Sequence, residues 1–158
     1  MVLQLISMGK RLLRLVIIAV GAYIVFGFLL TPVFVSGQSM EPTYDDHSFT
    51  FINRLSPLVS SPDRGEIVAV KIAGKKLMFL KRIIGLPGET IAIEDGQVII
   101  NDEPLNEPYL IDPEPWEYDP IRLEKNEYFI IGDNRRQPME QHVFGRVSLD
   151  RIVGSPIW

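Results

Sequence analysis

The segment ETIAIEDGQVIIND, residues 89–102, contains two short runs rich in Ile and Val on either side of an Asp-Gly pair. β-Branched side chains favour strands. Asp95 and Gly96 supply the positive φ angles that a tight hairpin turn requires. We therefore predict an antiparallel hairpin over this segment.

Other segments of the chain are also short runs rich in Ile, Val, Phe and Tyr, and they are bounded by Gly, Pro, Asn and Asp. Ala73-Gly74 suggests a second hairpin turn. Five prolines between residues 101 and 126 interrupt any strand ladder and predict a surface loop there. The sequence thus predicts an all-β domain over residues 36–158, whose other strand-like segments are GEIVAVKI (65–72), KLMFLKRIIG (76–85), EYFIIGD (127–133) and RIVGSPIW (151–158).

Composition narrows the classes of function. The chain has 158 residues, of which 46% are hydrophobic and 23% charged, as expected for one compact domain with an attached segment. It lacks cysteine, and histidine occurs only at His47 and His142, so we expect no disulfide, no thiol nucleophile and no metal site or cofactor, although carboxylates could still bind a hard cation. Phosphate-binding glycine motifs and basic-aromatic patches are absent from the sequence, so no nucleic-acid partner is expected.

The N-terminal end differs from the rest of the chain. Residues 1–14 carry Lys10, Arg11 and Arg14 and no acidic residue, whereas residues 36–158 carry a net charge of −7. The uncharged segment 15–35 has about the length that crosses a hydrocarbon core of ~30 Å. We predict a transmembrane helix over residues 15–35, with residues 1–14 in the cytoplasm and residues 36–158 on the far side.

Two other interpretations of this segment remain open. A cleaved signal peptide usually has an apolar centre of about 7 to 15 residues and an A-x-A-like site, which residues 33–37 lack. A buried helix of a soluble protein should show a polar stripe, and segment 15–35 shows none. The lipid bilayer is therefore the expected surrounding of this helix.

The strand-like run LMFLKRIIG carries one cation on each face, Lys81 and Arg82, among apolar residues. Alternation predicts that one of them is poorly solvated without saying which. A buried lysine can act as a base if its pKa falls by about three units, which costs about 4 kcal/mol, whereas arginine stays protonated. This favours Lys81. Alternatively, both cations reach solvent from an edge strand.

A serine nucleophile would need such a base. Ser39, in the segment that follows the apolar run, is the candidate. A triad of Ser39 with His142 and Asp133 is a second possibility, but a chain with only two histidines offers it by chance alone.

Three segments together resemble the boxes of type I signal peptidases, the membrane-anchored Ser/Lys-dyad family. They are SGQSMEPT (36–43), LKRIIGLPGE (80–89), and YFIIGDNRRQ (128–137) with VFGRV (143–147). Their order and spacing agree with the family, and so does the N-terminal anchor. The resemblance implies an all-β catalytic domain and cleavage of N-terminal signal peptides from secreted proteins.

The resemblance also implies roles for individual residues. Ser39 would be the nucleophile and Lys81 the general base, with the backbone N–H of Ser39 donating to the oxyanion. Gly37 offers no side-chain donor where some members have a hydroxyl. Asp133, Asn134 and Arg135 would shape their loop rather than take part in bond chemistry.

Substrate would add as a strand, with small Ala-like side chains in shallow pockets lined by Met40, Phe79 and Leu80. Met40 could instead be ordinary core packing. The expected partners are preprotein signal peptides, the lipid bilayer and the secretion translocon. The expected location is the plasma membrane, crossed once.

The third box departs from the usual family pattern. Pro138, Glu140 and His142 stand where many members have serine, aspartate and arginine. The usual serine bonds the catalytic lysine, so its loss predicts slower chemistry, and Glu140 with His142 could form a weakened, pH-sensitive pair. An alternative is therefore a catalytically weakened homologue that binds exported chains as a scaffold subunit. Self-cleavage, as in SOS-response repressors, is a third hypothesis.

Overall fold

The computed structural model describes residues 2–71 and 78–157. In this part of the chain the strands form two antiparallel sheets, which confirms the predicted all-β domain. The larger sheet has the order β1-β2-β11-β3-β4-β9-β10 and the smaller one β7-β6-β5-β8. The larger sheet comprises β1 (Leu30–Phe34), β2 (Phe49–Asn53), β3 (Ile67–Lys71), β4 (Met78–Gly85), β9 (Glu127–Ile131), β10 (Gly145–Ser148) and β11 (Ile152–Pro156).

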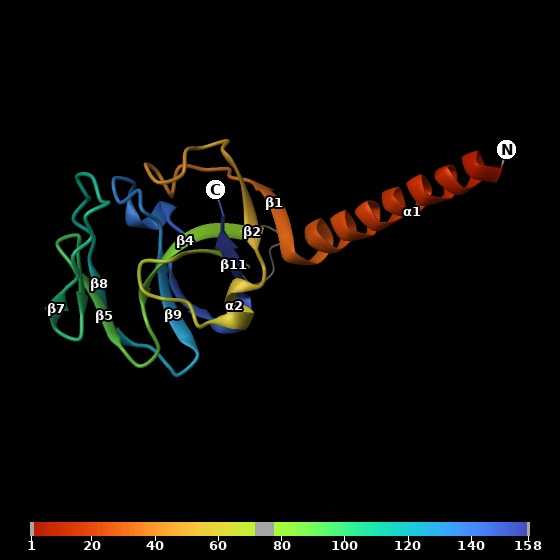
Figure 1. Ribbon diagram of the computed structural model, residues 1–158. Coiled ribbons are helices and arrows are strands. Elements are labelled where there is room, and N and C mark those ends of the chain that lie inside the picture. The colour runs from red at the N-terminus through yellow and green to blue at the C-terminus, as the bar shows by residue number, and fades with distance from the viewer. Residues whose placement is uncertain (1, 72–77, 158) are drawn as a thin grey trace.

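The smaller sheet lies at the opposite end of the domain from the N-terminal helix, as Figure 1 shows. Short helices join several of the strands. The strands of the smaller sheet are β5 (Thr90–Glu94), β6 (Gln97–Ile100), β7 (Glu103–Pro104) and β8 (Tyr118–Arg122). The short helices are α2 (Ser56–Val59), η2 (Met139–Gln141) and η3 (Leu149–Arg151).

The N-terminal helix α1 (Val2–Ile24) continues through a π-helical turn, η1 (Val25–Leu29), and projects away from the strands (Figure 1). The 21 residues Gly9–Leu29 are long and apolar enough to cross a membrane. The predicted C-terminal end of this segment was wrong, because Leu30–Phe34 is strand β1, paired with β2. Pro32 lacks the N–H that a helix needs, so the chain becomes extended before Val35.

The hairpin predicted over residues 89–102 is confirmed. Strands β5 and β6 pair in antiparallel register, with Glu94 opposite Gln97. Asp95 and Gly96 have φ angles of 49° and 77°, as the turn requires. Strands β3 and β4 also pair antiparallel, as expected of a second hairpin, but its predicted turn at Ala73-Gly74 lies outside the described residues.

The prediction that residues 101–126 form only a surface loop was wrong. Two strands, β7 and β8, form there and lie at the two edges of the smaller sheet. Pro104 and Pro120 are tolerated because an edge strand needs only half of its backbone groups for pairing. Trp116, just before β8, is only 4% exposed and anchors this segment in the core.

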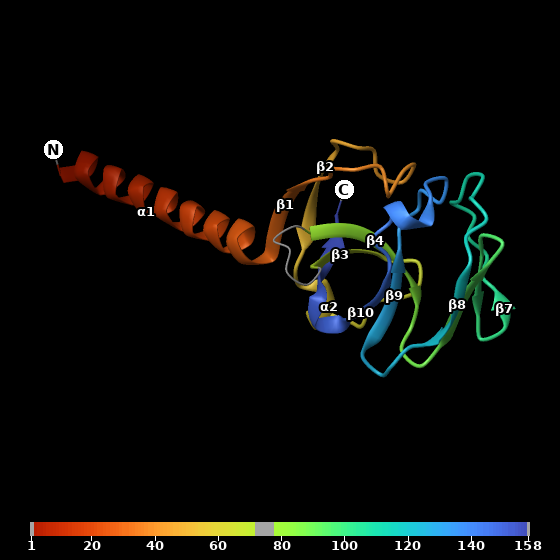
Figure 2. The same cartoon turned by 180° about the vertical axis from the view of Figure 1, so that it is seen from behind.

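Three buried apolar clusters hold the domain together. One joins the two sheets through Ile84 and Phe129 of the larger sheet and Ile91 and Ile93 of the smaller one, together with Trp116. A second cluster lies among β3, β4, β9, β10 and β11, strands that are seen from behind in Figure 2. The third contains Val35, Met40, Ile52, Ala69 and Leu80 and lies next to the segment that carries Ser39.

Gly154 allows β11 to lie close to β2. A Cβ atom at this position would stand 2.0 Å from the carbonyl oxygen of Asn53, a backbone atom that cannot turn away. We expect Gly154→Ala to lower the free energy of unfolding of the full chain in detergent micelles by about 2 kcal/mol, the typical cost of overpacking. Gly9→Ala, which meets nothing within 4 Å, is the matched control. Equal stability of the two variants would contradict this explanation.

Candidate active site

Ser39 lies in the turn between β1 and β2, and the loop after β9 holds this turn in place. The backbone N–H of Asn134 donates to the Ser39 carbonyl oxygen at 3.1 Å. The Asn134 side chain donates through Nδ2 to the Gln38 carbonyl oxygen at 2.9 Å. Two residues before the serine, the Gly37 N–H donates to the Asp46 carboxylate. The backbone on both sides of the serine is therefore fixed.

Lys81 lies in the middle of β4, opposite Val68 of β3, and is 1% exposed. Its Nζ donates to Ser39 Oγ at 2.7 Å. Burial lowers the pKa of the Lys81 amine to about 8, while the negative charge of Asp133 opposes part of this effect. About a tenth of this amine is therefore neutral at pH 7 and about half at pH 8.

Arg82, the other cation of β4, points to a different environment. Its Nε and Nη2 donate to the two oxygens of Asp133 at 2.8 and 2.5 Å, and its side chain is 12% exposed. The alternative in which both cations reach solvent was therefore wrong. Lys81 is the poorly solvated cation and forms no ion pair with the residues that the structure describes, whereas Arg82 is paired.

Asp133 is fully buried as a side chain and has a second partner besides Arg82. Thr43 Oγ1 donates to Asp133 Oδ2 at 2.5 Å, which joins the segment after Ser39 to β4 and to the loop after β9. The Arg82 guanidinium also lies over the Tyr109 ring, 4.0 Å from its centroid. This cluster fixes three separate segments around the serine and the lysine.

Arg135 and Glu107 form a buried ion pair that sequence reasoning missed. Their side chains are 1% and 3% exposed, and Arg135 Nη2 lies 2.7 Å from Glu107 Oε1. Arg135 Nε also donates to the Gly132 carbonyl oxygen. Tyr109 donates to Glu107, and burial together with that carboxylate raises the pKa of the Tyr109 hydroxyl. Glu107 and Tyr109 lie in a proline-rich segment without periodicity, so no sequence pattern marks them.

His142 follows η2 and is buried against Trp116, with ring centroids 4.8 Å apart. Burial, together with the nearby Lys81 charge, lowers the pKa of its imidazole to about 4, although the Asn134 backbone opposes this. The triad alternative is not assembled, because Ser39 contacts Lys81 while Asp133 pairs with Arg82. Among the described residues, Glu140 is exposed and forms no ion pair with His142.

Met40, Phe79 and Leu80, the predicted pocket residues, lie on the two segments that carry Ser39 and Lys81. Met40 and Leu80 are 1% and 8% exposed and pack in the cluster with Val35, Ile52 and Ala69. Phe79 is partly exposed. Their contact with substrate stays a prediction.

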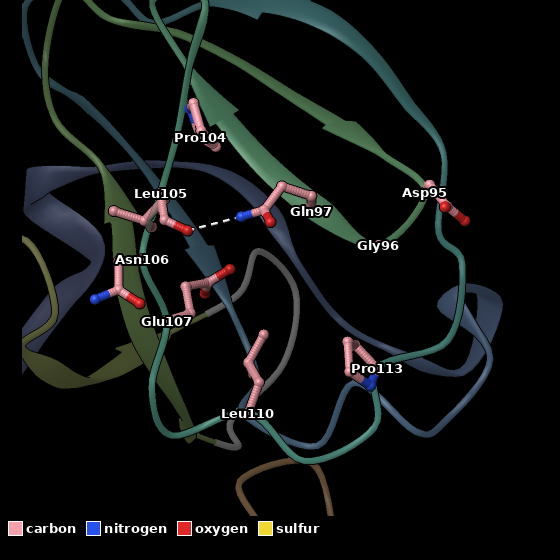
Figure 3. Close-up of a pocket in the computed structure, with 9 residues that line it drawn as sticks. All are labelled: Asp95, Gly96, Gln97, Pro104, Leu105, Asn106, Glu107, Leu110 and Pro113. Carbon is pink, nitrogen blue, oxygen red and sulfur yellow. Dashed lines mark hydrogen bonds between the residues drawn. The ribbon is translucent and has the colours of Figure 1, made fainter.

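A pocket of about 440 Å³ lies elsewhere, between the β5–β6 turn and the loop after β7 (Figure 3). Gln97 Nε2 donates to the Leu105 carbonyl oxygen across it. It contains no residue that the sequence assigned to the site. Among the described residues, no three His, Asp or Glu side chains are grouped to hold a metal ion.

These features define a class of protein, namely an all-β peptidase domain that follows a helix able to span a membrane. Residues 7–158 match the model of the family described as signal peptidase, peptidase S26. The chain belongs to this family, which confirms the resemblance seen in the sequence. Family membership supports the cleavage of signal peptides as its activity.

Individual relatives agree with this assignment. Signal peptidase I T of Bacillus subtilis (strain 168) is 32% identical over 158 residues, covering 93% of this chain and 80% of the relative. A signal peptidase I of Bacillus amyloliquefaciens is 35% identical over 152 residues, covering 89% and 81%. The crystal structure of a signal peptidase I from Enterococcus faecalis V583 is similar with a TM-score of 0.50 and 26% identity, covering 61% of this chain and 97% of that one.

The buried Arg82–Asp133 pair should contribute strongly to stability. Asp133→Asn leaves Arg82 without its counter-charge, so we expect a loss of about 3 kcal/mol in the free energy of unfolding, as for other broken buried pairs. The matched control is Asp112→Asn, which removes the exposed Asp112–Arg136 pair and should change little. Denaturant unfolding of the full chain in micelles measures both, and equal losses would refute the expected difference.

Proposed function

We propose that this protein is a membrane-bound serine endopeptidase that removes signal peptides, with Ser39 as nucleophile and Lys81 as general base. The observation that carries the proposal is the 2.7 Å contact between Lys81 Nζ and Ser39 Oγ, made by a lysine that is 1% exposed. The serine hydroxyl needs a base, and a desolvated amine is the base within hydrogen-bond reach.

In the first step, Lys81 is neutral and Ser39 Oγ–H donates to its lone pair. Ser39 Oγ attacks the scissile carbonyl carbon, its proton passes to Lys81 Nζ, and the carbonyl π electrons move to the oxygen. Among the described residues, no carbonyl or side chain accepts the Ser39 backbone N–H, which is free to stabilise that oxyanion. Collapse of the intermediate breaks the C–N bond, and Lys81 gives its proton to the leaving amine.

In the second step, water hydrolyses the ester formed on Ser39. Lys81, neutral again, takes a proton from the water as its oxygen attacks the ester carbonyl. When the second tetrahedral intermediate collapses, Ser39 Oγ leaves and recovers a proton from Lys81. The chain thus returns to its starting state, and the signal peptide is released with a new carboxylate.

The substrate preference follows from the space beside the serine. Met40 and Leu80 are packed tightly in the adjoining apolar cluster, and Phe79 is partly exposed on the same strand as Lys81. Pockets bounded by these residues would suit small side chains, which gives cleavage after Ala-x-Ala-type sequences. Extended substrate would bind alongside β4 as an added strand.

The helix sets the location. With Lys10, Arg11 and Arg14 at its cytoplasmic end, a span ending at Leu29 would put strand β1 and then Ser39 just beyond the opposite surface of the plasma membrane. A preprotein leaving the translocon presents its cleavage site at that surface. Proximity to the translocon therefore belongs to the proposal.

Substitution of either member of the dyad should abolish activity. We expect Ser39→Ala and Lys81→Ala to reduce cleavage of a preprotein in membranes by at least about a thousandfold, because each removes a group that bond breaking requires. Gel-shift of the processed product measures this. Wild-type processing by either variant would contradict the dyad, whereas preprotein binding without cleavage by the unaltered chain would favour the scaffold alternative.

The pH dependence should reveal the base. Below its pKa, Lys81 is an ammonium ion and cannot accept the serine proton, so kcat/KM should rise with pH through about 8 and then level off. Initial rates on an Ala-x-Ala fluorogenic peptide between pH 6 and 10 measure this profile. A profile that is already level at pH 6 would exclude Lys81 as the titrating base.

A further inference from the structure

His142 lies in the site although neither the dyad nor the ion pairs include it. Its ring is held on one side by the edge-on contact with Trp116, which is itself fixed by a hydrogen bond from Nε1 to the Gln137 carbonyl oxygen. The His142 backbone N–H donates to the Met139 carbonyl oxygen. The imidazole therefore has little freedom to turn.

Both ring nitrogens of His142 are buried, and neither makes a hydrogen bond of ordinary geometry with the described residues, although a backbone group of Asn134 lies close enough to favour the protonated ring. Buried polar atoms usually find a partner, because leaving one unsatisfied costs free energy. One candidate partner, Lys81 Nζ, is identified by the surroundings of Gly132. A Cβ atom on this glycine would lie 3.1 Å from Lys81 Nζ and 3.2 Å from His142 Nδ1. The two nitrogens thus border the same position, and their separation is at most 6.3 Å, the sum of these two distances.

The chemistry of a neutral lysine requires such a neighbour. When its lone pair faces the Ser39 hydroxyl, the amine still carries two N–H groups that point elsewhere. In a buried site these hydrogens need acceptors, and without them the amine can rotate its lone pair away from the serine. A neutral imidazole nitrogen is an acceptor.

We propose that His142 is a positioning residue for Lys81: His142 Nδ1 accepts a hydrogen bond from Lys81 Nζ through one bridging water and so keeps the lone pair aimed at Ser39. This inference rests on the proposed dyad. His142 neither touches the substrate nor takes a proton in the reaction. When Lys81 becomes an ammonium ion, the same bond strengthens and holds the proton ready for the leaving amine.

Burial, and after it the charges around His142, keep the imidazole in the neutral acceptor form by lowering its pKa. Lys81 of β4 and Arg135 of the loop after β9 both face the ring and disfavour a second positive charge on it. The Asn134 backbone, from the same loop, favours protonation but does not outweigh burial. Asp133 faces Lys81 but is engaged by Arg82 and Thr43.

Two variants test the role of the nitrogen. His142→Phe keeps a ring against Trp116 without an acceptor, and His142→Asn places a polar atom near the position of Nδ1. We expect His142→Phe to lower kcat about fivefold with KM unchanged, the effect of one hydrogen bond. In the pH profile of His142→Phe, the rise of kcat with pH (the acid limb) should move to lower pH, because the Lys81 ammonium form loses more from a missing acceptor than the neutral amine does. His142→Asn should restore both kcat and the position of the acid limb.

The control is His47→Asn, at the exposed second histidine, which should leave kcat and the pH profile unchanged. Thermal unfolding distinguishes a purely structural effect from the positioning effect, because loss of packing alone would lower thermal stability without moving the acid limb. An unchanged kcat and acid limb in His142→Phe would overturn the proposal, as would failure of His142→Asn to recover either.

A second measurement does not depend on the His142 variants. Proton NMR of the two imidazoles in the full chain in micelles, assigned with His47→Asn, follows the titration of His142. Lys81→Met removes the facing charge, so the pKa of His142 should move up toward its ordinary value of about 6.5. An unmoved titration would overturn the proposal.

If Ser39→Ala or Lys81→Ala still processed preprotein, the dyad itself would fail, whereas inactive dyad variants with a fully active His142→Phe would refute only the role of His142.

Discussion

The burial of one amine controls the organisation of this site. Lys81 is 1% exposed in the middle of β4, and loss of hydration lowers its pKa to about 8. An ammonium ion is costly to bury without a counter-ion, so the amine gives up its proton more readily than in water. The neighbouring cation, Arg82, keeps its charge in the same strand because Asp133 pairs with it. One strand therefore holds a neutralisable base and a permanent charge side by side.

The four residues Gly132 to Arg135 each perform a mechanical task that supports this base. Gly132 must lack a side chain, because a Cβ atom there would lie 2.2 Å from the Ser39 carbonyl oxygen. Asp133 binds Arg82 and Thr43. Asn134 donates to the carbonyl oxygens of Gln38 and Ser39, and Arg135 binds Glu107 in the loop before β8. The GDNR segment thus combines one steric requirement, at Gly132, with the polar contacts of the three residues that follow, in agreement with the sequence-based view that these three residues shape their loop.

Sequence reasoning succeeded where local rules dominate. Asp-Gly turn chemistry predicted the β5–β6 hairpin, and length and apolarity predicted the N-terminal helix. It failed where pairing partners are distant. Pro120 argued against a strand, yet β8 forms because it needs hydrogen bonds on one side only. The helix end was placed six residues too late, at Val35 instead of Leu29, because the apolar residues of Leu30–Phe34 outweighed Pro32 in that prediction, whereas Pro32 and the pairing with β2 make this segment a strand. Glu107 and Tyr109 carry no local signal at all.

The sequence by itself determined the fold class, the apolar helix, and the fact that one of two adjacent cations must be poorly solvated, because each of these follows from periodicity or composition over a few neighbouring residues. Only the tertiary structure decided which cation that is. The choice depends on Asp133, 51 positions beyond Arg82, which lies close enough to neutralise Arg82 and leaves Lys81 without a paired charge beside Ser39. Distances between segments far apart in the chain set the pKa of a buried group, and no local pattern contains them.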